Sequence, residues 1–468
     1  MKFLILLLAL GLVEPVFAAD FSRQDIETAR ELRAQTQAGN GGFDVVEELT
    51  TRIGPRLAGS GADARAVDWA EALLKDLGFD RVWREPATFP TWTRGSESVR
   101  VVHPVEQRMA ALAIGFSPAT PPGGLEAEVV MFDDLAALQA ADPATISERI
   151  VFIRNRMERA RDGSGYGPAV QARARAAMVA ADLGAAAVII RSIGTSTNRF
   201  AHTGGMRFDT SQRRVPAAAI SNPDADQLER LLALDEPVRL AMEIDAQVIE
   251  SYTSHNVIAE ITGTRYPDQI VALGAHLDSW DVGTGALDDG AGIAIITEAG
   301  RRILALDRRP DRSIRLIFFA AEEIGLWGGR AWAQARRDRI GDYQVAAESD
   351  FGAGPIYSIS ARVADEAWPV IQAIQAELAP LGIGLGERQA SGGPDFLPAL
   401  PLGLAVVDLD QDGTHYFDYH HTENDTLDKI DPAALAQNAA AYAVFAWLAA
   451  QSPVGFGSGP GLLSDSAE

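Results

Sequence analysis

Apolar residues recur at helical spacing in the first part of the chain and then give way to strand-like alternation. The helical segments span residues 20–39, 43–53 and 62–77. Two short alternating runs follow, over residues 81–83 and 98–103, and these indicate strands. Prolines and glycines over residues 118–124 interrupt the pattern, so we place a domain boundary between residues 121 and 122.

The middle of the chain combines short apolar runs with one long alanine-rich helix. The runs are typical of buried strands and cover residues 128–132, 150–153, 185–190, 215–220 and 238–244. The helix spans residues 169–183, and a stretch rich in glycine, serine and threonine over residues 194–205 indicates a loop. We therefore interpret residues 122–248 as an inserted α/β module.

The C-terminal part alternates strands with helices, which predicts a sheet covered by helices on both faces. The strands are expected over residues 269–275, 313–320, 344–349 and 402–409. The helices are expected over residues 290–306, 364–378 and 432–450. The predicted fold class is α/β with a mixed, mostly parallel sheet, formed by residues 19–121 and 249–452. The glycine-rich residues 453–468 predict a flexible tail.

The N-terminus has the pattern of an export signal. Lys2 precedes an apolar run over residues 3–13, and small residues follow at Ala18 and Ala19. This order is typical of a secretory signal, here residues 1–18, and predicts a periplasmic or secreted protein. The alternative is an N-terminal core helix. No later segment is expected to span a bilayer.

Composition excludes several kinds of partner and site. The chain has 64 Asp and Glu against 41 Lys and Arg, a net charge of -23, which disfavours binding to nucleic acid or to an anionic membrane. It has no cysteine, so disulfides, thiolate metal sites and a cysteine nucleophile are all excluded.

Four short segments place histidines and carboxylates where an expected strand ends. The first contains His276, directly after an apolar strand, then Asp278 and, after a glycine-rich loop, Asp288. Open α/β sheets build their sites at the carboxyl ends of the strands. A carboxylate two residues after His276 can accept a hydrogen bond from its second ring nitrogen and fix the tautomer that a metal ion needs.

The other three segments are Glu322–Glu323, Asp350 and His420–His421. Adjacent carboxylates at a strand end repel each other unless a cation lies between them or one carboxylate keeps its proton. A metal ion at Glu323 and a proton on Glu322 would relieve this repulsion.

Each segment alone also has an ordinary structural explanation. An Asp at a helix start is usually a cap, and adjacent Glu or His residues usually lie on a surface or in a core. However, three of the seven histidines fall in these four segments, and every segment follows a strand of one sheet. The combination favours one convergent site.

The donor types of this site are imidazole and carboxylate, without sulfur. They suit catalytic zinc, and manganese or cobalt is also compatible. Five donors exceed the four of a single tetrahedral ion. They suit two ions that share one carboxylate, at a separation of about 3.5–4 Å.

Together the four segments resemble the co-catalytic zinc exopeptidases, a family of secreted aminopeptidases and glutamate carboxypeptidases, and within it the carboxypeptidase Q subgroup. The resemblance covers most of the chain. It implies that residues 122–248 form a protease-associated-like domain. It also implies two Zn²⁺ ions per chain, with Asp288 bridging them, held by His276, Asp288, Glu323, Asp350 and His421.

The same resemblance implies roles for three further residues. Glu322 would be the general base, and Asp278 would orient His276. Many members have a tyrosine where this chain has His420, so whether His420 stabilises the oxyanion instead stays open.

The function implied is hydrolysis of short peptides by a metal-activated water, as in a dipeptidase of the carboxypeptidase Q type. An aminopeptidase that acts on longer peptides is the main alternative. A non-catalytic receptor-type domain and a cyclase-type acyltransferase with one zinc also share this fold, but the complete donor set argues against both. We expect a small peptide substrate and neither nucleic acid nor membrane as a partner, and relatives allow for a homodimer.

Overall fold

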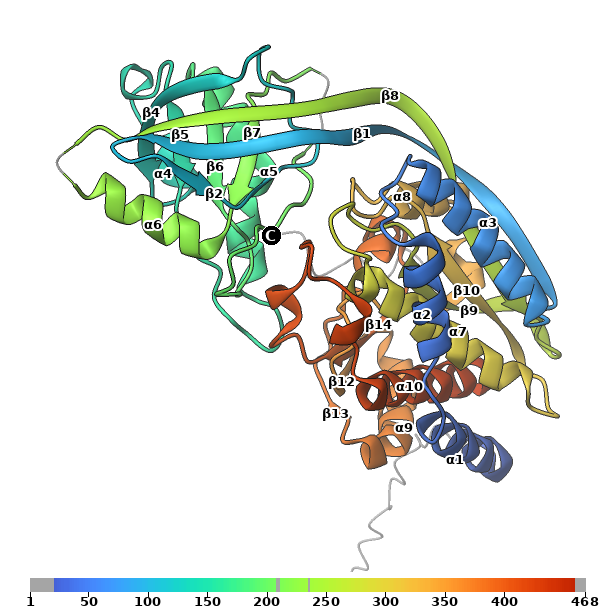
Figure 1. Cartoon of the computed structure of the whole chain (residues 1–468). Coiled ribbons are helices and arrows are strands. Elements are labelled where there is room, and N and C mark those ends of the chain that lie inside the picture. Colours follow the sequence, from blue (N-terminus) through green and yellow to red (C-terminus); the bar gives the residue numbers. More distant parts are fainter. Residues whose placement is uncertain (1–20, 208–210, 235, 459–468) are drawn as a thin grey trace, which may run out of the picture.

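The chain folds into two lobes joined by two long strands (Figure 1). The structure is a computed structural model and describes residues 21–207, 211–234 and 236–458. The expected export signal, residues 1–18, lies outside the described residues. The first lobe is built from the two ends of the described chain and the second lobe from its middle.

The first lobe contains a mixed, mostly parallel sheet, as predicted. Its strands are β1 (Arg81–His103), β8 (Arg239–Ile261), β9 (Tyr266–His276), β10 (Arg312–Phe319), β11 (Tyr343–Glu348), β12 (Ile356–Arg362), β13 (Gly384–Leu385) and β14 (Val406–Gln411). Their order is β13–β12–β14–β11–β9–β10–β8–β1. β9 runs parallel to β10 and β11, and β11 runs parallel to β14, so their carboxyl ends share one edge.

Helices cover both faces of this sheet, and side-chain caps begin α1, α3 and α10. One face carries α1 (Arg23–Gln37), α7 (Ala291–Leu304), α9 (Trp368–Leu378) and α10 (Pro432–Gln451). Three further helices belong to this lobe. α2 (Phe43–Glu48) contacts α7, and α3 (Gly61–Asp76) packs on β8. α8 (Trp327–Ala335) lies on the opposite face of the sheet. Ser22 and Asp25 form a capping box at α1. Phe319 packs edge-on against Trp332 and Phe396 beneath α8.

α10 is the central helix of the first lobe. Asp431 caps it by accepting a hydrogen bond from the amide of Ala433, and Pro432 occupies the first turn. By length and hydropathy α10 is able to cross a membrane, which corrects the expectation that no segment after the N-terminus is. However, 89% of its most apolar window is buried inside the protein, as in a core helix.

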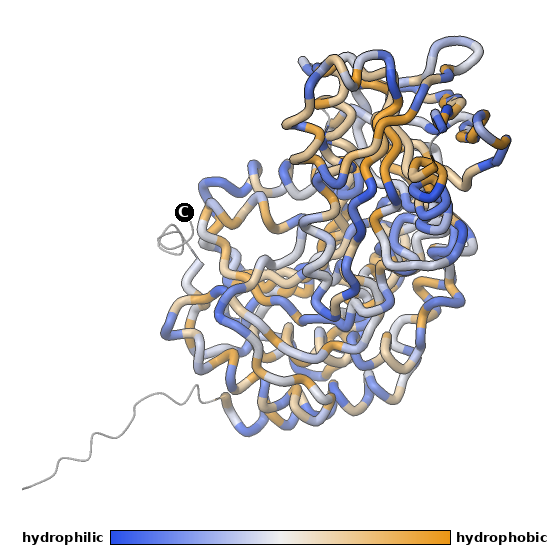
Figure 2. The backbone as a smooth tube through the Cα atoms, turned by 90° about the vertical axis from the view of Figure 1, so that its left-hand side faces the viewer, coloured by the Kyte–Doolittle hydropathy of each residue, from blue (hydrophilic) through white to orange (hydrophobic). Residues whose placement is uncertain are grey.

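The second lobe is a mixed sheet, parallel over its four central strands, with helices against it. Its strands are β2 (Gln107–Met109), β3 (Ala111–Ala113), β4 (Leu125–Phe132), β5 (Ile150–Ile153), β6 (Ala187–Arg191) and β7 (Ala217–Ile220). Its helices are α4 (Leu135–Gln139), α5 (Tyr166–Asp182) and α6 (Asn222–Leu232). β4 to β7 run parallel in that order, and Figure 2 shows hydrophobic residues concentrated on the central strands. β4 also pairs with β8, so one sheet of 14 strands passes through both lobes.

β1 and β8 arch side by side from one lobe to the other (Figure 1). They pair antiparallel from Arg81 and Glu260 at one end to His103 and Arg239 at the other. The two short strands predicted over residues 81–83 and 98–103 are therefore parts of one strand of 23 residues.

The lobes also do not divide at residue 121, where the boundary was predicted. β3 lies before that residue and pairs with β7 of the second lobe, and the far end of β1 pairs with β2 in the same lobe. The prolines and glycines over residues 118–124 form a connection within the second lobe rather than a boundary.

The predicted flexible tail is wrong for its described part, residues 453–458. Phe456 is fully buried in the first-lobe core, and its carbonyl accepts a hydrogen bond from the amide of Ala364. Ser458 donates to the carbonyl of Gln344, at 2.9 Å. Burial of the Phe456 side chain in the core fixes this segment in place despite the glycines around it.

We therefore predict that Phe456→Ala lowers the free energy of unfolding by about 3–5 kcal/mol, because it leaves a cavity in a packed core. Urea denaturation measures this value. The control is Val454→Ala, since Val454 is 36% exposed and its truncation is expected to cost about 0.5 kcal/mol or less. Equal, small effects of the two changes would instead support the prediction that this segment is a flexible tail.

Candidate metal centre

The four predicted segments meet at one edge of the first-lobe sheet. β9, β10 and β11 end at or just before His276, Glu322–Glu323 and Asp350. Asp288 lies in a turn directly before α7, and His420–His421 lie in the loop between β14 and α10. Because the carboxyl ends of these parallel strands share an edge, distant parts of the sequence converge there.

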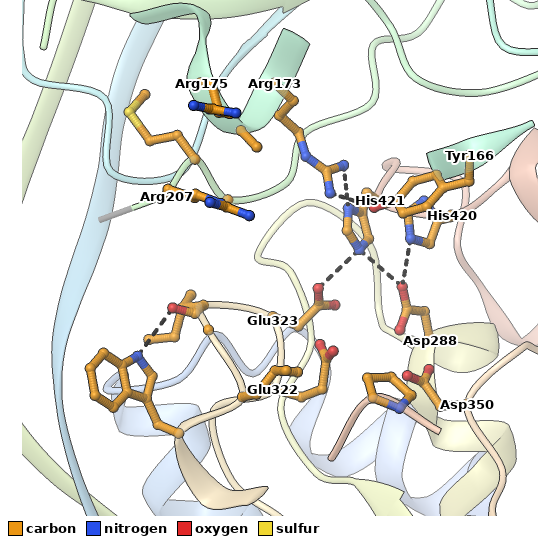
Figure 3. Close-up of a pocket in the computed structure, with 18 of the residues that line it drawn as sticks. Tyr166, Arg173, Arg175, Arg207, Asp288, Glu322, Glu323, Asp350, His420 and His421 are labelled. Atoms are coloured by element: carbon orange, nitrogen blue, oxygen red, sulfur yellow. Dashed lines mark hydrogen bonds and ion pairs between the residues drawn. The ribbon is translucent and has the colours of Figure 1, made fainter. Parts of the chain in front are cut away.

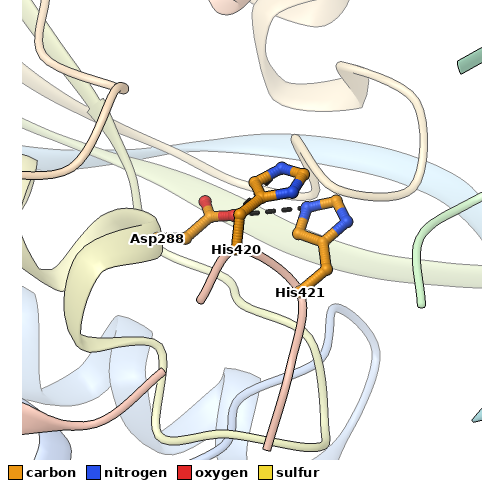
Figure 4. Close-up of side chains that lie close together, drawn as sticks. All are labelled: Asp288, His420 and His421. Carbon is orange, nitrogen blue, oxygen red and sulfur yellow. Dashed lines mark ion pairs between the residues drawn. The ribbon is translucent and has the colours of Figure 1, made fainter. Parts of the chain in front are cut away.

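The carboxylate of Asp288 lies between the imidazoles of His276 and His421, and Figures 3 and 4 show the side that faces His421. Its Oδ1 is 3.0 Å from Nε2 of His276, and its Oδ2 is 3.2 Å from Nε2 of His421. Oδ1 of Asp350 is 3.4 Å from the same nitrogen of His276. Oε2 of Glu323 is 2.9 Å from the same nitrogen of His421. All five predicted ligands therefore form two groups that share Asp288.

Asp288 is not a helix cap, which was its ordinary structural explanation. Its backbone is non-helical, with φ -127° and ψ 90°, and α7 begins after Gly290 without a side-chain cap. Its carboxylate is thus free to face the other donors.

The donors fit bound cations better than they fit hydrogen bonds to one another. Oδ2 of Asp288 and Oε1 of Glu323 are buried and accept no hydrogen bond within the described chain. Donor atoms of His276, Asp288 and Asp350 all lie within 4.8 Å of one another, as do those of Asp288, His420 and His421. Buried carboxylate oxygens without a partner are costly, and a divalent cation in each group would satisfy them.

The pKa shifts show how strongly these carboxylates depend on opposite charge. Burial raises the pKa of Glu323 to about 7, and the charge of Asp288 adds to this. Burial likewise raises the pKa of Glu322 well above its ordinary value, and Asp350 and Glu323 reinforce it. Burial opposes ionisation of Asp288 too, but the imidazoles of His276 and His421 beside it hold its pKa well below the ordinary value. Opposed shifts in one cluster are typical of functional sites.

A cavity of about 930 Å³ lies over the donors and is lined by residues of both lobes. We call Asp288, Glu322, Glu323 and Asp350 its acidic floor. Tyr166 of α5 lines the opposite side, so the second lobe forms a roof over the site (Figure 3).

Asp278 acts on the site differently from the prediction. Nδ1 of His276 lies 3.0 Å from the main-chain carbonyl of Asp278, whereas the nearest carboxylate oxygen is 3.6 Å away. The carboxylate instead accepts hydrogen bonds from the amides of Glu322 and Glu323, at 3.0 and 3.3 Å. The main chain thus fixes the His276 tautomer, and the side chain holds the turn that carries the two glutamates.

His420 lies beside the shared carboxylate. Its Nε2 is 3.6 Å from Oδ2 of Asp288, and its ring stacks on that of His421 with centroids 3.5 Å apart (Figure 4). Burial and the neighbouring His421 hold the pKa of His420 well below its ordinary value, so the imidazole is neutral. Its buried Nδ1 has no hydrogen-bond partner within the described chain.

Three buried charged residues that the sequence analysis missed hold the loop before α7. Asp425 accepts hydrogen bonds from the amides of residues 286–288, at 2.7–3.2 Å. Arg56 donates to the carbonyls of Thr284 and Gly285, at 2.8 and 2.9 Å. Asp289 accepts from the amide of His276, at 3.1 Å. Sequence offered no signal for Asp425 and Arg56, because each bonds to the main chain of a segment far away along the chain.

The second lobe also holds the histidine loop. Nδ1 of His202 donates to the carbonyl of His420, at 2.7 Å. The amide of Thr203 donates to the carbonyl of His421, at 3.0 Å, and Nδ1 of His421 lies 3.4 Å from the carbonyl of Thr203. Burial lowers the pKa of His202 to about 4, so the ring stays neutral at physiological pH. The imidazoles of His420 and His421, which lie beside Asp288, are thus positioned by contacts between the lobes.

Comparison with known proteins identifies the family. The profile of peptidase family M28 matches residues 256–446, which include all five predicted ligands. Carboxypeptidase Q of Bos taurus is 32% identical over 414 residues, which cover 88% of this chain and 86% of that protein. The chain belongs to peptidase family M28.

Solved structures agree with this assignment. The peptidase M28 precursor of Shewanella amazonensis is 50% identical with a TM-score of 0.91, and the match covers 93% of this chain and 99% of that one. A zinc aminopeptidase of Bacillus subtilis shares the fold, with 19% identity, a TM-score of 0.62 and coverage of 86% and 94%. The predicted resemblance and fold class are confirmed, and this M28 peptidase is a metallo-exopeptidase.

We predict that His202→Ala weakens metal retention about 10-fold, because it removes the donor that fixes the histidine loop. Competition with a chelator, followed by elemental analysis, measures retention. His103→Ala is the control, since His103 is exposed on β1. Wild-type retention in both variants would show that the contact between the lobes does not support the metal centre.

Proposed function

We propose that this M28 peptidase hydrolyses short peptides with two zinc ions per chain. The convergence of two histidines and two further carboxylates on the shared Asp288 carries this proposal. One ion would be held by His276 and Asp350 and the other by Glu323 and His421. Imidazole and carboxylate donors suit catalytic zinc, and the relation to a zinc aminopeptidase fold supports the same ion.

In this proposal Glu322 is the general base. Its carboxylate lines the cavity next to Glu323 (Figure 3), and the turn that carries it is held by Asp278. Bound zinc would supply a water whose pKa is lowered to about 7 and a positive charge for the oxyanion. Glu322 takes the proton of that water and returns it to the leaving amine.

The size of the cavity supports a short substrate. Its roof from the second lobe faces the acidic floor, and its volume of about 930 Å³ suits a ligand of a few residues. The relation to carboxypeptidase Q over most of both chains supports a carboxypeptidase. An aminopeptidase is the second candidate, because the fungal relatives named leucine aminopeptidase match 60% of this chain.

We propose further that residues 1–18 direct export, to the periplasm or outside the cell, in keeping with the precursor named among the related structures. We also propose that the second lobe is a protease-associated-like domain and that the protein forms a homodimer. Processing of the N-terminus, measured by mass spectrometry of the mature protein, tests export.

We predict that Glu322→Gln lowers kcat by roughly 10²–10⁴-fold while both zinc ions stay bound, because it removes a base and no ligand. Steady-state kinetics and elemental analysis measure the two quantities. Glu366→Gln changes an exposed glutamate and serves as the control. Near-normal turnover of Glu322→Gln would refute the role of the base.

A substrate panel tests the proposed function. The zinc-loaded protein is assayed on free dipeptides, on pentapeptides and on aminoacyl reporters with a free amino terminus. We expect the highest kcat/KM on free dipeptides. Higher values on pentapeptides and reporters would favour the aminopeptidase, and hydrolysis of none of them would favour a non-catalytic domain.

A further inference from the structure

The cavity over the donors carries opposite charge on its two sides. The acidic floor comes from the first lobe, whereas the roof presents Arg173 and Arg175 of α5 together with Arg207 (Figure 3). A ligand that spans the cavity therefore meets carboxylates at one end and guanidinium groups at the other.

Arg175 and Arg207 are held next to each other. The amide of Arg207 donates to the carbonyl of Ala174, at 3.0 Å, which ties the segment of Arg207 to the turn of α5 that carries Arg175. Both side chains are exposed, and both line the cavity. Neither forms a hydrogen bond or an ion pair through its side chain within the described chain.

The other arginines of the cavity are already engaged. Arg173 is buried, and it donates to the hydroxyl of Tyr166 and to the carbonyl of Thr203. Arg330 donates to the carbonyl of Gly325, at 2.9 Å, and covers the ring of Trp327. Arg175 and Arg207 are thus the pair with free guanidinium groups in this cavity.

Free arginines are notable in so acidic a chain. Carboxylates outnumber basic side chains 64 to 41, and in the same lobe Arg154, Arg159 and Arg191 all pair with carboxylates. Two adjacent guanidinium groups that lack such partners and face a cavity are suited to bind an anion from outside.

We propose that Arg175 and Arg207 bind the terminal carboxylate of the substrate's leaving residue. The inference rests on the proposed function, since a free dipeptide carries an ammonium group at one end and a carboxylate at the other. The arginine pair holds the carboxylate end at the roof, so the scissile amide lies over the donors on the opposite side of the cavity. The pair thus makes a free carboxylate a condition for efficient hydrolysis.

The test uses three peptides with the same first residue. The first is a free dipeptide with a neutral second side chain, and the second is its C-terminal amide. The third is an amide with Glu in second position, which offers a side-chain carboxylate alone. The proteins are the zinc-loaded wild type, Arg175→Gln, Arg207→Gln, the double variant and, as a control, Arg65→Gln at an exposed position of α3.

We expect the double variant to lose roughly 10- to 100-fold in kcat/KM on the free dipeptide, the effect of removing charge-assisted hydrogen bonds. Both amides are expected to change by about twofold or less, and Arg65→Gln is expected to match the wild type on all three peptides. Zinc content is measured for every variant and is expected to be unchanged.

Three outcomes overturn the inference. One is an equal loss on the free dipeptide and on its amide, which would indicate a structural role. Another is no loss on the free dipeptide. The third is a loss confined to the peptide with the Glu side chain, which would assign the pair to side-chain recognition.

A failure of the proposed function is distinguishable from a failure of this inference. If the wild type hydrolyses none of the peptides, calorimetric binding of the free dipeptide and its amide to the zinc-loaded protein replaces the kinetic readout. Tighter binding of the free dipeptide that is lost in the double variant supports the arginine pair. Equal binding of both peptides, or binding unaffected by the double variant, overturns it.

Discussion

The carboxylate of Asp288 is the one group that both halves of the metal centre share. Its two oxygens face His276 on one side and His421 on the other, and the remaining donors, Asp350 and Glu323, each join one of these imidazoles. A buried carboxylate in this position is stable only if cationic charge lies on both sides of it. The surrounding structure therefore has to hold four other side chains at one point in nearly fixed positions.

The fold meets this constraint in two ways. Parallel strands of the first lobe end at one edge, so short segments after them converge without long loops. The loop that carries Asp288 is then fixed from beneath by Asp425 and Arg56, which bond to main-chain atoms. Residues with left-handed backbones, Ala321 and His421, lie next to or within the donor set. Such conformations persist where surrounding contacts determine them, as at functional sites.

Much of the first lobe and of the donor set was predictable from sequence, because His276, Glu323 and Asp350 stand at or shortly after the ends of apolar strands. His276 and Asp350 needed no knowledge of long-range contacts beyond the order of the strands. The role of Asp278 was not predictable, because it depends on which of its oxygens faces His276 and which faces the amide of Glu322.

The link between the lobes was also hidden in the sequence. β1 was predicted as two short strands and β8 only over residues 238–244, because their pairing register is irregular near Phe89 and Arg94 and the alternation breaks there. His202 gave no signal, since it lies in a glycine-rich stretch and bonds to a carbonyl more than 200 residues away along the chain. The second lobe is consequently more than an insertion: it holds the histidine loop and roofs the cavity above the donors.

Diffraction from zinc-soaked crystals at the zinc absorption edge tests the central claim most directly. The account predicts two anomalous peaks about 3.5–4 Å apart, one beside His276 and Asp350 and the other beside Glu323 and His421, with Asp288 between them. A single peak, or peaks that do not contact Asp288, would contradict it.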